Sequence, residues 1–560
     1  MYHGSAAPPA RLRLGLQTLY HLYPQQQTTR LNYDCIIGAR AMATSGDTAT
    51  IKKRVVAGSF IFKIPNGDDK QARVALFRRS SKVRTYQHKL APCSGSVEKH
   101  DASPLAAALR EIQEETTLPV SSLDLLRVGK PYAFTDESIG REWNINPFAF
   151  RLKDIAEGGK GEEGITLDWE HDGIEWFDPM QVSGSDEFGG VPRLIDSLRR
   201  VWPEYDLGPA AGRVLTEGLQ RLRDDHEHGA RELAGIAVST LRDVVSQMAL
   251  SHPMDESWWP KVCMAAWHIC QSRPSMGAAI TSATIKALGA IEPIYLADTF
   301  AEDKIKLIAQ ALDQQLAQRR SATDRICQSF TEYVHQNILQ GRESKKTVSV
   351  LTLSSSSTIS SSLLRAASTL GVALDLRVLE SRPLCEGVTL ASRILNDSQH
   401  GLHAKVTIYS DASVALAARE VDIVLLGADR ISSAGDLSNK IGSLPAVLAA
   451  RYVNPNVKVL VLSDTDKIAG PGSMEEHSSE ENSHLELTQA WKGVVGGAEV
   501  VEDALSRDEP KVAVKNAYFE WVPADLIDAY ATEEGLWNTE QIQQKSTLVG
   551  DEIKKYFEGL

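Results

Sequence analysis

The sequence has little cysteine, no excess of positive charge and no long apolar run. Its six cysteines are scattered over 560 residues without a CxxC pair, which excludes a disulfide scaffold and favours a reducing, cytoplasmic compartment. Its net charge is −13, so it lacks the positive field that attracts a phosphate backbone, and nucleic acid is a weak candidate partner. No stretch approaches the roughly 18 consecutive apolar residues of a membrane span, so none is expected.

The length predicts two to four domains, at roughly 100 to 200 residues each. The first 33 residues contain three arginines and no Asp or Glu, a composition that fits either a mitochondrial targeting segment or a disordered extension. Changes in apolar pattern then divide the chain. We expect an N-terminal extension over 1–49, an α/β domain over 50–205, a linker over 206–212, a helical subdomain over 213–340 and a sheet subdomain over 341–560.

The α/β domain is predicted from short apolar runs bounded by turn residues. These runs cover residues 55–64, 74–79, 131–134, 143–152 and 173–177, with a strongly helical stretch at 104–116 and a terminal helix at about 191–201. Proline and glycine between residues 203 and 212 mark the linker.

The helix at 104–116 has the densest chemistry. Ser103 is a suitable N-cap and Pro104 suits the first helical position. Leu105, Leu109 and Ile112 form the expected buried stripe, so the nearby glutamates are predicted on the opposite side.

These glutamates are Glu111, Glu114 and Glu115. Three carboxylates within one turn repel one another unless a cation offsets their charge. Such hard oxygen ligands suit Mg2+ or Mn2+, which would bridge substrate phosphates. The alternative is a solvated acidic face.

Residues 95–118 resemble the Nudix signature, G-x5-E-x7-R-E-U-x-E-E-x-G-U. The match from Arg110 is close except that Thr117 replaces the final glycine, whereas Asp101 stands for the first glutamate and lies one residue further from Arg110 than the signature requires. The resemblance implies an α/β/α sandwich that hydrolyses a nucleoside diphosphate derivative. Glu111, Glu114 and Glu115 would carry the metal, and Arg110 would orient them. Glu162 and Glu163 lie where family members often supply a general base, but the sequence does not decide this.

The second half alternates strands and helices. Strands are expected at 348–353, 374–379, 405–409, 422–426 and 457–462, separated by helical segments. This alternation predicts a Rossmann-like parallel sheet covered on both faces. Residues 470–483 are polar and acidic and look like a mobile insertion.

Several ordered motifs resemble the family of initiation factor 2B alpha, beta and delta subunits. That family includes methylthioribose-1-phosphate and ribose-1,5-bisphosphate isomerases. The motifs lie at residues 272–277, 378–387, 408–411, 421–431, 435–442, 516–519 and 532–535. The resemblance spans about 213–560 and implies a homodimer or higher homo-oligomer formed through this half.

The same region has residues suited to a sugar phosphate. Arg273 and Arg382 can grip phosphate oxygens, and Ser354 and Ser355 lie between a strand and a helix N-terminus, where backbone N–H groups favour an anion. Asp429, Asn439 and Lys440 are predicted just beyond strand ends, where parallel sheets bind ligands. Alternatively, Asp429 and Lys440 serve packing or a subunit interface.

In the isomerases of this family, a cysteine and the aspartate of the Gly-Ala-Asp-Arg motif share the proton transfer. Asp429 matches that aspartate, but Ser354 occupies the cysteine position. A hydroxyl is a much poorer acid than a thiol, so we expect the isomerase chemistry to be weakened or lost. Cys385 belongs to another motif and is predicted to line the pocket.

Cys263, His268 and Cys270 have a loosely metal-like spacing, but they lie among tryptophans in an apolar helix. We therefore predict core positions for them.

The leading hypothesis is a Mg2+-dependent Nudix-type hydrolase fused to a module that binds a small phosphate ester or nucleotide. One alternative is an aldose-1-phosphate isomerase that uses Asp429. The other is a non-enzymatic regulatory or assembly protein related to translation initiation factor 2B, whose Nudix half senses a ligand and whose candidate partners include translation initiation factors.

Overall fold

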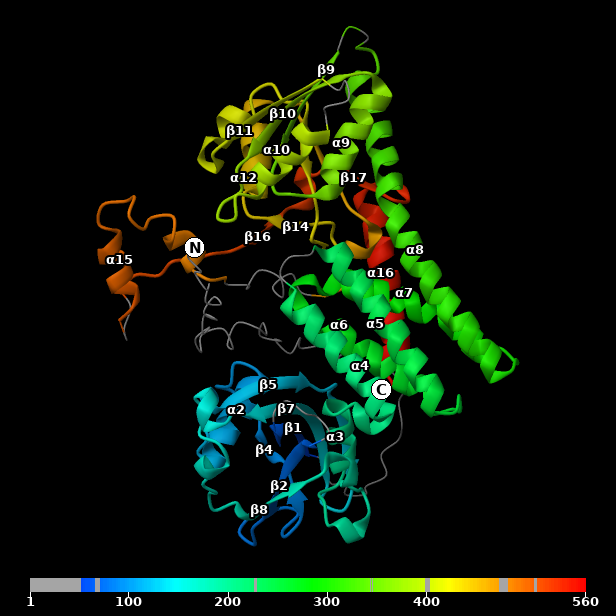
Figure 1. Ribbon diagram of the computed structural model, residues 1–560, viewed down its shortest axis with the longest axis vertical. Coiled ribbons are helices and arrows are strands. Elements are labelled where there is room, and N and C mark those ends of the chain that lie inside the picture. The colour runs from blue at the N-terminus through cyan, green and yellow to red at the C-terminus, as the bar shows by residue number, and fades with distance from the viewer. Residues whose placement is uncertain are drawn as a thin grey trace, which may run out of the picture.

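A computed structural model describes residues 52–65, 71–225, 229–342, 344, 346–397, 403–472, 482–507 and 511–560. These form an N-terminal α/β domain, a helical subdomain and a C-terminal sheet subdomain along the long axis (Figure 1). The expected extension at 1–49 lies outside the described residues, as does most of the predicted insertion at 470–483.

The N-terminal sheet is built around β1 (Lys52–Lys63). β1 runs parallel to β7 (Arg141–Leu152) and antiparallel to β2 (Arg73–Arg79) and β4 (Cys93–Ser96). The remaining strands are β3 (Leu90–Ala91), β5 (Leu123–Val128), β6 (Tyr132–Asp136) and β8 (His171–Phe177). The five predicted strands are therefore present, although the sequence analysis missed β3, β4 and β5.

Two helices cover the two faces of this sheet. Along β1, Ala57 and Ile61 pack with α2 (Pro104–Thr116). The alternate residues Phe60 and Phe62 pack with α3 (Leu194–Val201), as the two-residue period of a strand requires. The predicted α/β/α sandwich is confirmed, and Ser103 caps α2 by accepting a hydrogen bond from the Ala106 N–H.

The segment predicted as a linker, 206–212, lies inside α4 (Glu204–Asp224). Gly208 has φ 75° and ψ 165°, which breaks the helix into two parts. Pro209 then falls at the start of the second part, where its missing N–H costs little. The proline and glycine therefore produce a kink instead of a loop.

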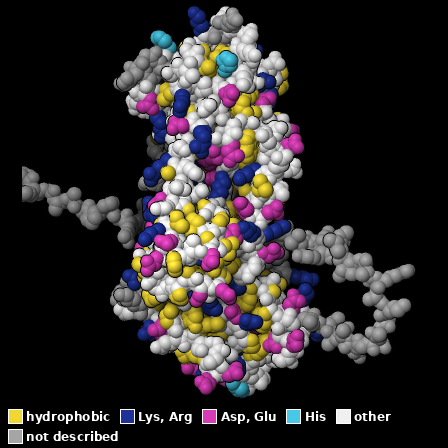
Figure 2. All heavy atoms as spheres, turned by 90° about the vertical axis from the view of Figure 1, so that its right-hand side faces the viewer, with side chains coloured by type: hydrophobic (Ala, Val, Ile, Leu, Met, Phe, Trp, Pro, Cys, Tyr) yellow, Lys and Arg dark blue, Asp and Glu magenta, His cyan; other side chains and the backbone are white. Residues whose placement is uncertain are grey.

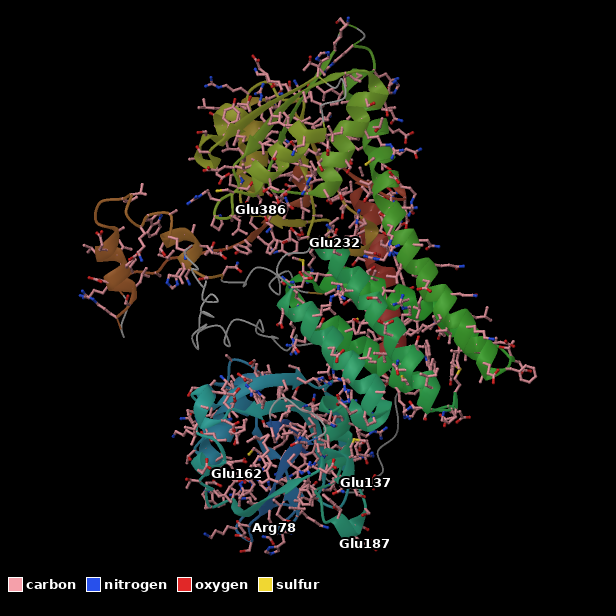
Figure 3. All side chains as sticks on the ribbon, in the orientation of Figure 1. Arg78, Glu137, Glu162, Glu187, Glu232 and Glu386 are labelled. Atoms are coloured by element: carbon pink, nitrogen blue, oxygen red, sulfur yellow. The ribbon has the colours of Figure 1, made fainter. Side chains whose placement is uncertain are left out.

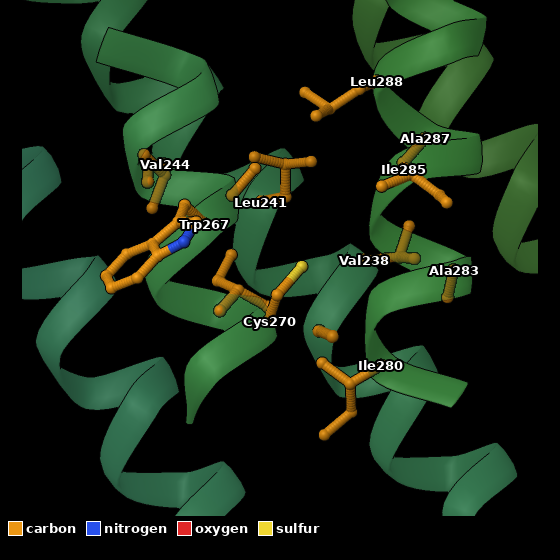
Figure 4. Close-up of a cluster of buried hydrophobic side chains, with 14 of the residues drawn as sticks. Val238, Leu241, Val244, Trp267, Cys270, Ile280, Ala283, Ile285, Ala287 and Leu288 are labelled. Atoms are coloured by element: carbon orange, nitrogen blue, oxygen red, sulfur yellow. The ribbon is translucent and has the colours of Figure 1, made fainter. Parts of the chain in front are cut away.

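The helical subdomain has one apolar core, part of which is drawn in Figure 4. Cys263, His268 and Cys270 are buried in α6, so their predicted core positions are confirmed. Helix α5 has the length and composition of a membrane span, but 56% of its apolar window is buried inside the protein. The helices after α4 are α5 (Ala230–Ser251), α6 (Trp258–Gln271), α7 (Gly277–Leu296) and α8 (Ala301–Val334).

The C-terminal subdomain contains the five predicted strands in one mainly parallel sheet. Its order is β11-β10-β9-β12-β15-β17-β18, in which only β17 and β18 pair antiparallel. The strands are β9 (Thr347–Thr352), β10 (Ala373–Leu379), β11 (Ala404–Tyr409), β12 (Ile423–Leu426), β15 (Lys458–Leu462), β17 (Ala529–Thr532) and β18 (Gly535–Trp537).

Helices and a small antiparallel sheet surround this parallel sheet. The helices include α9 (Ser357–Leu370), α10 (Glu386–Asp397), α12 (Ser443–Val453) and α16 (Thr539–Phe557). The small sheet contains β13 (Arg430–Ile431), β14 (Leu437–Lys440) and β16 (Phe519–Val522). Helix α16 then returns to the helical subdomain, where Tyr556 and Phe557 join the core.

Charged side chains of both signs are interspersed on the face shown in Figure 2. This face therefore has no broad basic stripe of the kind that tracks a nucleic-acid backbone.

Buried ion pairs join the helical and sheet subdomains just after β15. Asp466 is 6% exposed and bonds the Lys286 ammonium at 2.5 Å and the Arg319 guanidinium. Asp464 pairs with Arg231 at 2.8 Å. The two cations hold the pKa of Asp466 well below its usual value in spite of its burial.

Replacing Asp466 by Asn should destabilise the protein by about 3–5 kcal/mol, because two partly buried cations lose their counter-ion. Denaturant unfolding of the full chain measures this change. Asp324→Asn is the matched control, since its pair with Arg365 is largely exposed and should contribute less than about 1 kcal/mol. Equal effects of the two substitutions would contradict this assignment.

Candidate functional site

Arg110 lies at the centre of the acidic cluster on α2. Its Nη1 donates to Glu111 Oε1 at 2.8 Å and to Glu114 Oε2 at 3.1 Å. The same guanidinium pairs with Asp101 at 3.0 Å. Asp101, which departs from the Nudix signature, therefore still takes part in orienting Arg110.

Glu115 occupies a different environment from its two neighbours. The side chain of Glu114 is 59% exposed, whereas Glu115 is only 3% exposed. The prediction that all three glutamates share the face opposite the core is wrong for Glu115. Residue 115 follows Ile112 by three positions, so its side chain lies on the buried stripe of the helix.

The Glu115 carboxylate is only half satisfied. Its Oε1 accepts a hydrogen bond from the Ser94 N–H at 3.3 Å. Its Oε2 is buried and has no hydrogen-bond partner among the described residues. The nearest basic group is His171, whose Nε2 lies 3.7 Å from Glu115 Oε2. Burial lowers the pKa of this histidine, which favours the neutral imidazole.

Burial and mutual repulsion raise the pKa values of these acids. Burial is the main cause of the raised pKa of Glu115, and the charges of Glu111 and Glu170 raise it further. Burial also raises the pKa of Glu111, against the opposing effect of Arg110. A cation among these oxygens would relieve the repulsion and satisfy the buried Oε2.

The residues therefore fit a divalent cation chemically, although the described ranges hold no ready-made group of three or more His, Cys, Asp or Glu ligands. Glu111 is not free to act as a ligand in this arrangement, because its Oε1 accepts a hydrogen bond from Arg110. A Cβ at Gly95 would overlap the Glu111 carboxylate, so a larger residue at this position would displace that side chain.

Glu170 is an acidic residue that the sequence analysis missed. It is half-buried just before β8, burial raises its pKa, and its charge raises the pKa values of Glu111 and Glu115. Glu162, one of the two predicted base candidates, instead pairs with Lys63 at 2.6 Å. No local motif marks Glu170, because only the folding of its loop over α2 brings it to the cluster.

A second polar cluster lies in the sheet subdomain, in a different part of the molecule (Figure 3). The Ser354 hydroxyl donates to Glu386 Oε2 at 3.1 Å. The Lys440 ammonium contacts the other oxygen of Glu386 at 3.2 Å and lies over the Tyr518 and Phe519 rings. Glu386 therefore links two predicted site residues, although the sequence analysis did not select it.

The backbone around Ser354 is held in an uncommon conformation. Ser354, Ser381 and Cys385 have φ values of 68°, 63° and 54°, a region that costs non-glycine residues energy. The Ser354 N–H donates to Ser381 Oγ at 2.7 Å. The Asp411 carboxylate accepts from the N–H groups of Ser381 and Arg382 at 2.9 and 2.8 Å. These bonds bring together the three loops that follow β9, β10 and β11.

Asp429, Asn439 and Lys440 are the other residues predicted to bind the ligand, and two of them do not lie where they were predicted. Asn439 and Lys440 lie inside strand β14, so the prediction that they follow a strand end is wrong. The cause is the small antiparallel sheet, which the parallel alternation of the chain did not reveal. Asn439 is buried and donates to Ser443 Oγ at 2.9 Å, while the Asp429 N–H donates to the Ser438 carbonyl at 2.9 Å.

The two predicted phosphate-binding arginines have local contacts. Arg382 Nη1 lies 3.7 Å from Cys385 Sγ, within the same loop. Arg273 Nη1 donates to the Asp225 carbonyl after α4. Ser355 is half-buried in the turn before α9, whose N-cap is Ser356, so the predicted strand-to-helix turn is present.

Comparison with protein families separates the chain into the same two parts. The model of the initiation factor 2 subunit family (IF-2B) matches residues 225–539, more than half of the chain. The chain belongs to this family. The NUDIX domain model matches residues 57–200, so the N-terminal domain is a Nudix domain.

Among curated relatives of the chain is a methylthioribose-1-phosphate isomerase of Yarrowia lipolytica, 29% identical over 215 residues, which are 37% of this chain and 55% of that protein. The ribose 1,5-bisphosphate isomerase of Haloferax volcanii is 31% identical over 172 residues, or 31% of this chain and 47% of that protein. The chain thus spans about half the length of these relatives. The solved 5-methylthioribose 1-phosphate isomerase of Pyrococcus horikoshii OT3 has 20% identity and a TM-score of 0.41, with 62% of this chain and 88% of that chain covered.

The protonation of Glu115 should make the stability of the metal-free protein depend on pH. Its folded-state pKa is raised above the ordinary value of 4.5, so the folded form keeps a proton that the unfolded form releases. Stability should therefore fall as the pH rises above about 4.5. Glu115→Gln should remove this loss and stabilise the protein by about 1–3 kcal/mol at pH 8.

Urea unfolding between pH 5 and 8 in the presence of a chelator measures the effect. The exposed Glu114→Gln variant is the control and should follow the unsubstituted protein. Parallel stability curves for Glu115→Gln and the unsubstituted protein would contradict the assignment of a buried, repelled carboxylate.

Proposed function

We propose that the Nudix domain is a Mg2+- or Mn2+-dependent hydrolase of a nucleoside diphosphate linked to another group. The observation that carries the proposal is the buried, unpartnered oxygen of Glu115 beside Glu111, within the segment that matches the Nudix signature. Glu111, Glu114 and Glu115 would hold the cation, which when bound supplies Lewis-acid stabilisation of the phosphate oxygens.

The remaining chemistry belongs to the side chains around this cluster. Arg110 positions Glu111 and Glu114 through charge-assisted hydrogen bonds. Glu170 is our candidate general base, because its raised pKa makes it a better proton acceptor than an ordinary carboxylate. Glu162 is occupied by Lys63.

We propose that the family domain binds a sugar phosphate or nucleotide without the isomerase reaction of its relatives. Lys440 and the N–H groups at the start of α9 would meet the phosphate. Ser354 lacks the acidity of a thiol, and its hydroxyl is already donated to Glu386. The domain would form a homo-oligomer, and we place the protein in the cytoplasm, with mitochondrial targeting by the first 33 residues as the alternative.

The hydrolase proposal predicts divalent-metal-dependent release of a nucleoside monophosphate or phosphate from a member of a broad panel of nucleoside diphosphate derivatives. The combined substitution Glu114→Gln with Glu115→Gln should lower kcat by about 100-fold or more, because the cation loses two ligands. Glu162→Gln is the matched control and should keep most of the activity. Absence of turnover across the panel, or full activity in the double variant, would contradict the proposal.

A second candidate function, aldose-1-phosphate isomerisation, is favoured by one observation. Glu386 accepts a hydrogen bond from the Ser354 hydroxyl and contacts Lys440, so a carboxylate lies beside the cysteine position and can accept a proton in place of the missing thiol. This candidate predicts conversion of an aldose 1-phosphate to its ketose that Asp429→Asn abolishes.

The proposal that the family domain only binds its ligand predicts that the aldose phosphate binds without being converted. Calorimetry measures the binding, and product analysis measures the conversion. A regulatory or assembly role would show neither reaction, and a translation initiation factor would instead be recovered in a stable complex.

A further inference from the structure

A cavity of about 540 Å³ lies where the C-terminal end of the family domain meets the Nudix domain. Figure 1 shows the C-terminus beside α3 and α4. One wall comes from β6 and the residues before it, another from α3, and a third from residues 558–560. This cavity is on the α3 side of the N-terminal sheet, whereas the glutamates of the Nudix signature belong to α2 on the other face.

The cavity is rich in cations. Lys130, Arg193 and Arg200 line it, together with two acidic side chains, Asp196 and Glu558, and the C-terminal residue Leu560. Asp196 pairs with Arg193 at 3.2 Å. Arg200 Nε is buried and has no hydrogen-bond partner within the described ranges. Among the described residues, neither Lys130 nor Arg200 forms an ion pair with a carboxylate, whereas Arg193 does.

The surroundings destabilise the charged forms of Lys130 and Arg200. Burial lowers the pKa values of Lys130 and Arg200, and the charge of Arg200 lowers that of Lys130 further. A bound anion beside Lys130 and Arg200 would offset this repulsion between the two cations.

Aromatic rings form the adjacent wall. The Tyr132 and Phe134 rings stack with their centroids 6.2 Å apart and their planes 19° from parallel. The Arg200 guanidinium lies 4.6 Å from the Tyr132 centroid. The Tyr132 hydroxyl is anchored to Ser197 at 2.8 Å, so this wall is held in place by α3. Flat apolar rings beside clustered cations suit a ligand with both a planar base and phosphates.

We propose that this cavity binds a nucleotide, with its phosphates at Lys130 and Arg200 and its base against the Tyr132 and Phe134 wall. Because residues from both domains line the cavity, the bound nucleotide contacts the Nudix domain and the end of the family domain together. Its occupancy therefore couples the two domains, and it is separate from the substrate of the Nudix cluster.

The test is titration calorimetry of the full chain with ADP, pyrophosphate and adenosine, without divalent metal. The protein carries Glu114→Gln and Glu115→Gln, so that the Nudix cluster contributes little to the measured nucleotide binding. ADP should bind more tightly than either of the other two. Lys130→Met with Arg200→Met should weaken ADP binding at least about tenfold. Lys82→Met with Arg84→Met, which removes two exposed cations of the same domain, should leave it unchanged.

Thermal melting checks that the variants are folded. Without nucleotide, the Lys130→Met, Arg200→Met protein should melt no lower than its parent, because it loses two mutually repelling cations. If this double variant does not fold, Lys130→Met alone takes its place, with at least a threefold loss of ADP affinity expected. ADP affinity that is absent, equal to that of pyrophosphate, or unchanged by the cavity substitutions would overturn the proposal.

Discussion

The burial of Glu115 is the constraint around which the Nudix site is arranged. A carboxylate that is nearly excluded from water needs a hydrogen-bond partner for each oxygen. The Ser94 N–H donates to Oε1 of Glu115, whereas Oε2 has no partner among the described residues. Arg110 does not contact Glu115, because it is engaged by Asp101, Glu111 and Glu114. The site thus concentrates negative charge that the protein itself leaves partly uncompensated. This is the electrostatic condition for binding a cation and, through it, a phosphate.

The family domain uses the opposite arrangement. Glu386 is compensated on both sides, by the Ser354 hydroxyl and the Lys440 ammonium. Asp466 likewise meets two cations at the joint between the helical and sheet subdomains. Compensated charges of this kind hold loops and subdomains in place. In the cavity beside the C-terminus, Lys130 and Arg200 are two cations that form no ion pair among the described residues.

Periodicity in the sequence predicted the elements that bury one clear face. The helix Pro104–Thr116, its Ser103 cap and the five parallel strands of the second half follow from local pattern, and all are present. Proline and glycine were less informative, because Gly208 and Pro209 kink a helix where a loop was expected. Their backbone preferences suit both structures, and only packing against the neighbouring helices selects one.

The site could be predicted only where one segment supplies it. Glu111 and Glu114 were readable from the signature. The position of Glu115 beside the buried stripe also follows from its spacing to Ile112, but its near-complete burial depends on how deeply α2 lies on the sheet. Glu170, just before β8, and Glu386, at the start of α10, reach their clusters from distant parts of the chain, which no local spacing records. The placement of Asn439 and Lys440 inside β14 depends on pairing with β16, about 80 residues further along the chain.

The central claim is that Glu115 and its acidic neighbours form a divalent-cation site. Titration of Mn2+ into the full chain, followed by electron paramagnetic resonance at pH 8, tests it most directly. The account predicts that the unsubstituted protein binds Mn2+, that this binding weakens as the pH falls, and that the Glu115→Gln variant does not bind the ion. Absence of Mn2+ binding, or equal binding by the Glu115→Gln variant, would contradict it.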